Sequence, residues 1–400
     1  MCKTANTAVM DMLKEAKNLQ AELSAWRRYL HEHAETGFDL PQTTGFIQTE
    51  LIKMGYSPQK CGKAGILAEV GEGEIFLLRA DIDALPIREE TGEHFACKTG
   101  NMHACGHDMH AAMLLGAAKL LKSYEKELKC KIRLLFQPAE EILEGAKDVI
   151  HAGALQNVKG GMMIHVMTNV SLPVGTAVVS SAGVSSPAAD FFTIAIKGKS
   201  CHGSTPWNGV DALSAAAHIL IALQELSARE LNPGMPAVLT IGSFHGGNAS
   251  NVIADFVELK GTLRAFDEEI RIMVKTRLEE ISKNVAKAFR ARAKVTYSSG
   301  CPTLVNDKNL SIFAEKVAKE ALGEQNVFTS AQLSGDAKTR SGGSEDFAYI
   351  SHETPCVMIA VAAGEPKNGY EYPLHHPKVK FDERALSVGA ALYAQMALNW

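Results

Sequence analysis

The sequence lacks the long apolar segment that a membrane-spanning helix requires, because no run of about 18 apolar residues occurs along its 400 positions. Its N-terminal stretch carries charges throughout and lacks both the apolar centre and the cleavage site of a signal peptide. The eight cysteines are scattered without the paired spacing of a disulfide framework. These absences predict a cytoplasmic protein with reduced thiols and no membrane association.

The chain also lacks a basic block. Its 41 Lys and Arg residues are balanced by 45 Asp and Glu residues, which gives a net charge of -4 at pH 7, so a nucleic-acid partner is not expected. Apolar residues make up 46% and charged residues 22%, values typical of a soluble enzyme. Because 400 residues exceed what one hydrophobic core usually organises, we expect one large domain and one smaller domain.

Helices alternate with short apolar strands in the first part of the chain. Strands that alternate with helices predict an α/β fold with a largely parallel sheet and helices on both faces. The same alternation returns near the C-terminus, with an apolar strand at 356–362 and a closing helix from 382. In the first part, the helical patterns cover 8–30, 42–54, 108–125 and 141–151, and the buried-strand runs cover 66–70, 74–79, 131–137 and 161–165.

The middle of the chain follows a different order of elements, β-α-β-β-α-β. This order is that of the ferredoxin-like unit, which can fold as an inserted α+β domain. We therefore predict an α/β domain in two parts, 1–187 and 302–400, interrupted by a lid or dimerisation domain at 188–301. Its strands are expected at 191–197, 237–244, 256–266 and 293–297, and its helices at 210–229 and 267–290.

Polar side chains follow three of the predicted strands. Asp81 and Asp83 come after the first, Glu140 and Glu141 after the second, and His165 ends the third. Ligands of open α/β sheets bind beyond the carboxyl ends of the strands, so these side chains are expected to meet at one edge. Each residue alone has another explanation, since acids favour the first turn of a helix and a lone histidine is often a core residue. Their shared position predicts a functional site.

A cysteine and a histidine occur two residues apart in the segment HACGHD at 103–108, on the loop that enters a predicted helix. Cys105 and His107, beside a carboxylate, are ligands that a borderline-soft divalent metal prefers. The alternative for Cys105 is a buried free thiol. Glu140 and Glu141 add one acid that can ligate and one that can accept a proton from water, so these residues together indicate metal-assisted hydrolysis.

The remaining histidines are less specific by position. His31 and His33 fall near a helix end ahead of the first strand, where we expect surface histidines. The pair His375 and His376 lies in a loop and is equally compatible with a plain surface turn. Position alone therefore leaves the remaining ligands open.

A series of motifs runs in order along the chain: LRADIDALP at 78–86, MHACGHD at 102–108, FQPAEE at 136–141, IHV at 164–166, GSEDF at 343–347 and LHHP at 374–377. Together they resemble the aminoacylase and carboxypeptidase group of dinuclear metallohydrolases. Within that group the chain is similar to the amidohydrolase branch, which includes hippurate hydrolases and auxin-conjugate hydrolases. The resemblance runs nearly end to end. It implies a metallohydrolase catalytic domain with an inserted lid or dimerisation domain, and a homodimer.

The resemblance also implies a metal-ligand set. Cys105 matches a bridging ligand, a place that many relatives fill with aspartate, while His107, Glu141, His165 and His375 match the other ligands. The choice of His375 over its neighbour rests on motif alignment alone. Two divalent ions per subunit are implied, and a thiolate bridge favours zinc, cobalt or nickel over magnesium, with manganese still open.

Catalytic and substrate-binding roles follow from the same resemblance. Glu140 matches the general base, and Asp83 matches an acid that orients a ligand histidine. His202, in the segment GKSCHGS, matches a lid histidine that reaches the reaction centre, often from the neighbouring subunit. Asn251 and Arg264 match residues that hold the free carboxylate of the substrate, for which an amide donor and a guanidinium are suited. The alternatives are a loop histidine at 202 and a surface ion pair at Arg264.

The implied reaction is hydrolysis of the amide bond of an N-acyl-L-amino acid to a carboxylic acid and a free amino acid. A dipeptidase or carboxypeptidase, an N-acetyl-diaminopimelate deacetylase, and a catalytically silent metal-binding protein remain alternatives. The family pattern departs at Ala34 and Ala254, where relatives carry proline. Neither position is an implied ligand, so we expect only local loop differences.

Overall fold

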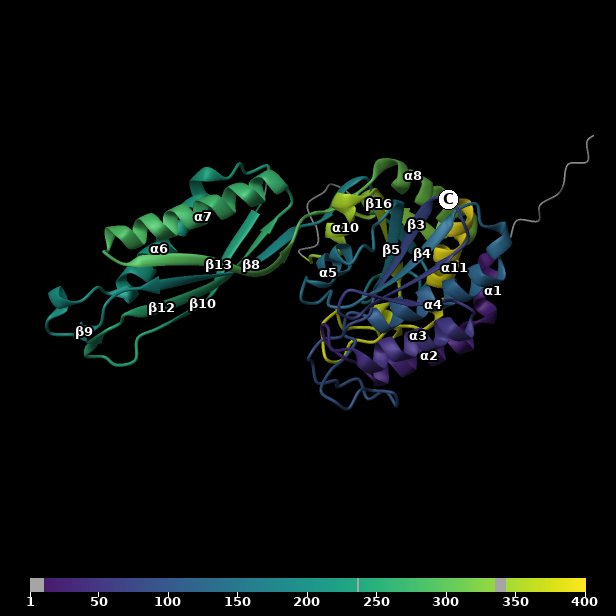
Figure 1. Cartoon of the computed structure of the whole chain (residues 1–400), viewed down its shortest axis with the longest axis horizontal. Helices are drawn as coiled ribbons and strands as arrows, with labels where there is room; N and C mark the ends of the chain where they lie inside the picture. The colour runs from purple at the N-terminus through teal and green to yellow at the C-terminus, as the bar shows by residue number, and fades with distance from the viewer. Residues whose placement is uncertain (1–10, 236, 335–342) are drawn as a thin grey trace, which may run out of the picture. The chain divides into compact units, whose positions relative to one another are not determined.

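The computed structural model describes residues 11–235, 237–334 and 343–400. Within these residues the chain forms two compact units (Figure 1). Of the described residues, the first comprises 11–183, 305–334 and 349–400, and the second comprises 184–235, 237–304 and 343–348. The division falls a few residues outside the predicted limits of 188 and 301. The predicted fold class, an α/β unit interrupted by an α+β unit, is confirmed.

A mixed eight-stranded sheet forms the centre of the first unit. Its strands are β1 (Gln59–Cys61), β2 (Gly65–Val70), β3 (Ile75–Asp81), β4 (Lys131–Gln137), β5 (Val158–Met167), β6 (Ala177–Val179), β15 (Val327–Thr329) and β16 (Cys356–Ala362), and their order is β1-β2-β4-β3-β5-β16-β6-β15. The central strands β4, β3, β5 and β16 are parallel to one another, whereas β2 and β6 run antiparallel to their central neighbours. All four carboxyl ends therefore lie at one edge.

Helices bury the apolar strands because both faces of a parallel sheet must be covered. Every residue of β3 is buried, and Phe76 and Leu78 on one of its faces share a core with α4 and α11. The helices outside the insert are α1 (Met12–Asn18), α2 (Gln20–Glu32), α3 (Pro41–Lys53), α4 (His107–Ser123), α5 (Gly145–His151), α8 (Lys308–Leu322), α9 (Ser330–Ser334), α10 (Phe347–Glu353) and α11 (Arg384–Asn399).

The second unit is a four-stranded antiparallel sheet with two helices on one face (Figure 1). Its elements follow the predicted β-α-β-β-α-β order: β8 (Ala188–Lys197), α6 (Ala212–Glu225), β10 (Ala237–Gly246), β12 (Phe256–Ala265), α7 (Glu268–Ala288) and β13 (Arg292–Cys301). The strand order is β10-β12-β8-β13. Two very short strands, β9 (Cys201–His202) and β11 (Val252–Ile253), form a separate antiparallel pair. At the connections to the first unit lie β7 (Gly183–Ser186) and β14 (Leu304–Asn306).

The structure differs locally from the predicted elements. The pattern at 8–30 contains two helices, α1 and α2, and its first three positions lie outside the described residues. Helix α5 begins at Gly145 and not at 141, because Ala139 and Leu143 have left-handed φ angles of 57° and 56°. Strands β1, β6 and β15 were not predicted, since three residues are too few to show a period.

Two further expectations concern the cysteines and the membrane. The seven cysteines among the described residues are free thiols, and Cys2 lies outside that part of the chain. Within the described ranges, the helices are too short or too polar to cross a lipid bilayer.

Candidate metal centre

Loops at the carboxyl edge of the first unit's sheet bring together side chains that are distant in sequence. Cys105 and His107 lie at the start of α4, Glu140 and Glu141 follow β4, and His165 lies in β5. Each of these residues belongs to a group of potential ligand atoms that lie within 4.8 Å of one another. His375 joins from a C-terminal loop, in a group with Cys105 and Glu141. The three sequence motifs and this loop therefore build one cluster.

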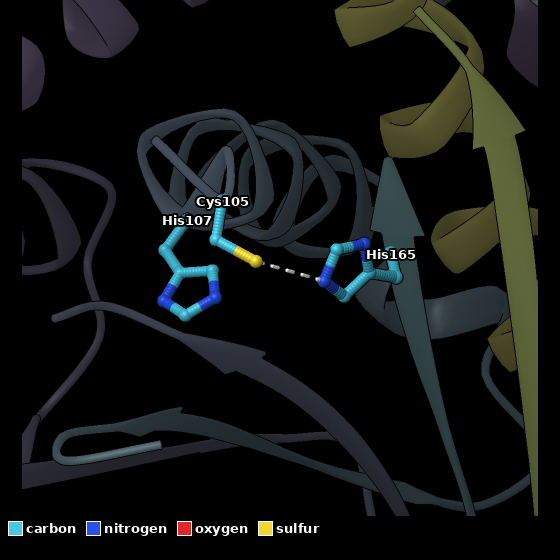
Figure 2. Close-up of side chains that lie close together, drawn as sticks. All are labelled: Cys105, His107 and His165. Atoms are coloured by element: carbon cyan, nitrogen blue, oxygen red, sulfur yellow. Dashed lines mark hydrogen bonds between the residues drawn. The ribbon is translucent and has the colours of Figure 1, made fainter. Parts of the chain in front are cut away.

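Cys105 lies in the middle of the cluster. It belongs to one group with His107 and His165 and to a second group with Glu141 and His375. Its Sγ lies 3.5 Å from Nε2 of His165 (Figure 2). The Nε2 atom of His375 lies 3.7 Å from Oε2 of Glu141. One thiol thus lies within 4.8 Å of two sets of potential ligand atoms, a position suited to a bridging ligand.

The ligand atoms in the cluster are spaced as metal ligands are. The Nε2 atom of His107 lies 3.8 Å from Oε1 of Glu141 and 3.9 Å from Oε2 of Glu140. Two ligands at about 2.1 Å from a tetrahedral ion lie about 3.4 Å apart, which is close to these separations. Both Nε2 of His107 and Oε1 of Glu141 are buried without a hydrogen-bond partner. Buried polar atoms rarely lack partners, so these two atoms fit a bound cation.

The hydrogen bonds of two histidines turn their Nε2 atoms toward the cluster. Nδ1 of His107 lies 2.9 Å from the backbone oxygen of Asp83, and Nδ1 of His165 lies 2.6 Å from the backbone oxygen of Val166. A carbonyl oxygen only accepts, so each Nδ1 donates a proton to it and each Nε2 is the nitrogen that the neutral ring can offer to a metal. Metal-ligating histidines are commonly held in this way.

Electrostatics couple the buried acids and imidazoles of the cluster. Burial disfavours the charged form of His107, but the Asp81 carboxylate and the Cys105 thiolate outweigh it and hold the pKa of His107 well above its ordinary value. Burial raises the pKa of Glu141, although His107 and His375 act in the opposite direction. The cluster therefore brings carboxyl, thiol and imidazole groups together, with Cys105, His107 and Glu140 buried and His375 exposed.

Comparison with known proteins identifies the family of this chain. The model of peptidase family M20/M25/M40 matches residues 77–399. The chain belongs to that family. The predicted family is thereby confirmed, and with it the class of metal-dependent hydrolase.

The relatives of this M20 family member include a deacetylase and a hippurate hydrolase. The N-acetyl-L-cysteine deacetylase of Bacillus subtilis (strain 168) is 38% identical over 94% of this chain and 88% of its own length. The hippurate hydrolase of Campylobacter jejuni is 33% identical over 98% of this chain and 100% of its own. A crystal structure from Bacillus subtilis, described as a dinuclear metal-binding peptidase of the M20 family, has a TM-score of 0.78. It is 32% identical over 96% of this chain and 98% of that one.

Asp83 acts on this M20 site mainly by holding backbone. Its carboxylate accepts hydrogen bonds from the backbone N–H groups of Glu140 at 2.9 Å and Glu141 at 3.2 Å, and lies 3.6 Å from Nδ1 of His107. Nδ1 of His107 lies closer to the Asp83 carbonyl, at 2.9 Å, than to the Asp83 carboxylate. Asp83 therefore links the acidic loop to His107.

Strained backbone occurs at two of the site loops. Ala139, which precedes Glu140, and His375 both have left-handed φ angles, 57° and 66°. Such conformations cost a non-glycine residue roughly 1–3 kcal/mol and often mark functional sites. The backbone N–H of His375 donates to the Ala104 carbonyl at 2.9 Å, which ties the C-terminal loop to the loop that carries Cys105.

The expectation that His31 is a surface histidine is wrong. Its ring is 2% exposed, with Nδ1 2.9 Å from Oδ2 of Asp108 and Nε2 3.1 Å from Oε2 of Glu89. Arg27, one turn earlier on α2, donates through Nε to the same Asp108 oxygen at 2.7 Å. The spacing of four residues between Arg27 and His31 is the signal that was available, because such residues share a helix face. His33, at the helix end, is half-buried and contacts the Tyr29 carbonyl through Nδ1.

Removal of Arg27 is predicted to destabilise the first unit strongly. Arg27→Met leaves the fully buried Asp108 carboxylate without its guanidinium, which costs about 3–5 kcal/mol of unfolding free energy. Arg28→Met is the matched control, because Arg28 pairs with Glu383 near the surface and its loss costs about 0–1 kcal/mol. Urea denaturation of the two variants measures the difference. Equal losses would mean that the buried pair does not stabilise the fold.

The sequence-based reasoning also missed a buried network behind the ligands. Asp81 lies 2.5 Å from Nδ1 of His110 and accepts from Nη1 of Arg79 at 2.8 Å, and all three side chains are fully buried. Burial lowers the pKa of His110 to about 4. The arginine and histidine had no signal in the sequence beyond their place in two of the motifs.

The three remaining predicted residues lie in the second unit. His202 and Asn251 are both exposed. They lie near each other because β9 pairs with β11 and the N–H of Gly203 donates to the Asn251 carbonyl at 2.7 Å. Arg264 lies near the last residue of β12, half-buried, with its guanidinium 5.1 Å from the ring centre of Phe191. Burial lowers the pKa of Arg264. Within this unit, His202 and Arg264 therefore lie toward opposite ends of β12.

Proposed function

We propose that this chain is a metal-dependent amidohydrolase that cleaves the amide bond of N-acyl-L-amino acids. The observation that carries the proposal is the pair of buried, unpartnered atoms, Nε2 of His107 and Oε1 of Glu141, among further sulfur, nitrogen and oxygen ligand atoms. The names of the relatives support the substrate class, since they are deacetylases and a hippurate hydrolase that act on acylated amino acids.

Five residues would hold two divalent ions: Cys105, His107, Glu141, His165 and His375. When bound, such ions supply Lewis acidity to the acyl carbonyl and to the attacking water. The thiolate and three imidazoles favour zinc, cobalt or nickel over magnesium, and manganese is a further candidate.

Glu140 is the proposed general base. Its side chain is 8% exposed, and its backbone N–H donates to the Asp83 carboxylate at 2.9 Å, so its carboxylate is held beside the proposed ligand atoms. In the reaction the carboxylate accepts a proton from the attacking water and then delivers it to the leaving amine nitrogen. The carbon–nitrogen bond breaks as a carboxylic acid and a free amino acid form.

Residues of the second unit would bind and polarise the substrate. Arg264 and Asn251 are suited to the free carboxylate, and His202 to the oxygen on which negative charge develops. In an N-acyl amino acid the carboxylate and the acyl carbon are separated by at most about 4 Å. Phe256, at the start of β12, lies three residues after β11, which pairs with the strand that holds His202. Arg264 follows Phe256 by eight residues on β12, a distance of roughly 27 Å.

One copy of the second unit therefore cannot place both His202 and Arg264 on the same substrate. We infer that the enzyme is a homodimer in which each substrate meets His202 from one chain and Arg264 from the other. The protein partner would be a second copy of this chain, and no nucleic-acid partner is expected.

A panel of substrates tests the proposed reaction. N-acetyl-, N-benzoyl- and aminoacyl-methionine, together with N-acetyl-diaminopimelate, are incubated with the zinc-loaded enzyme, and release of the free amino acid is measured. We expect hydrolysis of acetyl- or benzoyl-methionine, because the sequence assigns no acid to a free α-amino group. Preference for the aminoacyl substrate would indicate a dipeptidase, and preference for the diaminopimelate derivative would indicate a biosynthetic deacetylase. No turnover of any substrate would contradict the proposal.

A further inference from the structure

His110 lies between two of the proposed ligands. It follows His107 by three residues on α4 and is fully buried. The centre of its ring lies 5.4 Å from that of His107 and 4.5 Å from that of His165. It is absent from the proposed ligand set, yet its ring centre lies closer to that of His165 than the ring centre of His107 does, at 6.2 Å.

Both ring nitrogens of His110 make a hydrogen bond. Nε2 accepts from the backbone N–H of Val166 at 2.8 Å. A backbone N–H can only donate, so Nε2 carries a lone pair and the ring proton sits on Nδ1. Nδ1 in turn donates to Asp81, whose other oxygen accepts from the buried Arg79. His110 is therefore fixed in one orientation and is not available as a metal ligand.

Val166 transmits this constraint to His165. Its N–H donates to His110, and its carbonyl accepts from Nδ1 of His165 at 2.6 Å, so both of its backbone polar groups are engaged. The bond from His165 to that carbonyl directs the opposite nitrogen, Nε2, toward Sγ of Cys105, 3.5 Å away. The chain of contacts runs from Arg79 through Asp81, His110 and Val166 to the ligand nitrogen.

We propose that His110 is a positioning residue that sets the direction of Nε2 of His165 through the Val166 backbone. The proposal rests on the proposed function, because it requires His165 to be a metal ligand. Supporting residues of this kind typically change metal affinity by roughly 10–100-fold when they are removed.

A double-mutant cycle on Zn²⁺ affinity tests the proposal. His110→Phe, which keeps a ring but loses both hydrogen bonds, is combined with His165→Ala, and the dissociation constant of Zn²⁺ is measured by competition with a chromogenic chelator. We expect His110→Phe to weaken binding by roughly 10–100-fold in the wild-type background and by less than about 2-fold in His165→Ala. Equal effects in both backgrounds, or no effect in the wild type, would overturn the proposal.

Two amide variants keep the test decisive if His110→Phe does not fold. The side-chain oxygen of Gln reaches the Val166 N–H, whereas Asn is one methylene shorter and retains only the contact with Asp81. Zn²⁺ affinity should stay near wild type in His110→Gln and fall in His110→Asn, and equal affinities would overturn the positioning role. If His165→Ala alone leaves Zn²⁺ binding intact, the proposed ligand set is itself wrong. If His165→Ala weakens Zn²⁺ binding but His110→Phe has the same effect in both backgrounds, the ligand set is retained and the positioning role of His110 is rejected.

Discussion

Glu140→Gln should lower kcat by at least about 100-fold while the enzyme keeps its bound metal. The amide has the shape of the carboxylate but cannot accept the proton of the attacking water. The backbone of the loop is held by the Asp83 carboxylate, so the substitution leaves the neighbouring Glu141, a proposed ligand, in place. Steady-state hydrolysis of N-acetyl-methionine and the metal content of the same sample are measured together.

Glu144→Gln is the matched control on the same loop. Glu144 pairs with Lys147 near the surface and lies outside the ligand groups, so its variant should keep wild-type turnover. Near-wild-type kcat in Glu140→Gln would remove Glu140 from its role as base. Loss of metal from Glu140→Gln would instead make it a ligand.

Mixed dimers of two inactive variants should regain activity. Glu140→Gln lacks the base and His202→Ala lacks the lid histidine, and each homodimer is expected to lose at least about 100-fold in kcat. If His202 acts on the partner's site, the mixed dimer contains one site with both residues. Dimers carrying two different affinity tags and purified in tandem should then show about half of the wild-type activity.

The reciprocal pairing provides the control. A wild-type chain paired with a chain that carries both substitutions has no complete site if His202 acts in the partner, and one complete site if it acts within its own chain. We therefore expect this dimer to be nearly inactive. Half of the wild-type activity in this dimer, with none in the first mixture, would place His202 in its own chain's site.

The sequence was sufficient to predict the sheet edge at which the cluster forms. Strands β3, β4 and β5 are largely apolar toward their carboxyl ends, and a polar residue lies at or near each of these ends: Asp81, Gln137 and His165. The carboxyl ends of parallel strands lie at one edge of the sheet, so the meeting of polar residues from three strand ends can be predicted without knowing the loop conformations. The fold of the inserted unit could also be predicted, since few folds are compatible with its order of helices and strands.

The packing of α2 against the site could not be read in the same way. Arg27 and His31 are charged or titratable residues on a helix face, and such residues are usually exposed. Their burial depends on Asp108, 81 positions from Arg27, which compensates the guanidinium inside the protein. A contact between residues so far apart is decided by tertiary structure and leaves no periodic signal.

The conformation of the loops was the other feature that could not be predicted from the sequence. Ala139 and His375 have left-handed backbone, which local preference would not place at an alanine or a histidine. The N–H of His375 donates to the distant Ala104 carbonyl, and the N–H of Glu140, next to Ala139, donates to Asp83. The same holds for Asp83, whose contact through its carbonyl depends on where the loop passes His107.

Metal stoichiometry tests the central claim most directly, namely that Cys105 joins two sets of ligands around two ions. The protein is loaded with Zn²⁺, freed of excess metal by gel filtration, and analysed by inductively coupled plasma mass spectrometry. We predict two ions per chain in the wild type and in Cys97→Ala, a buried thiol outside the ligand groups, and fewer than two in Cys105→Ala. A wild-type protein without zinc, or a Cys105→Ala variant that still holds two ions, would contradict it.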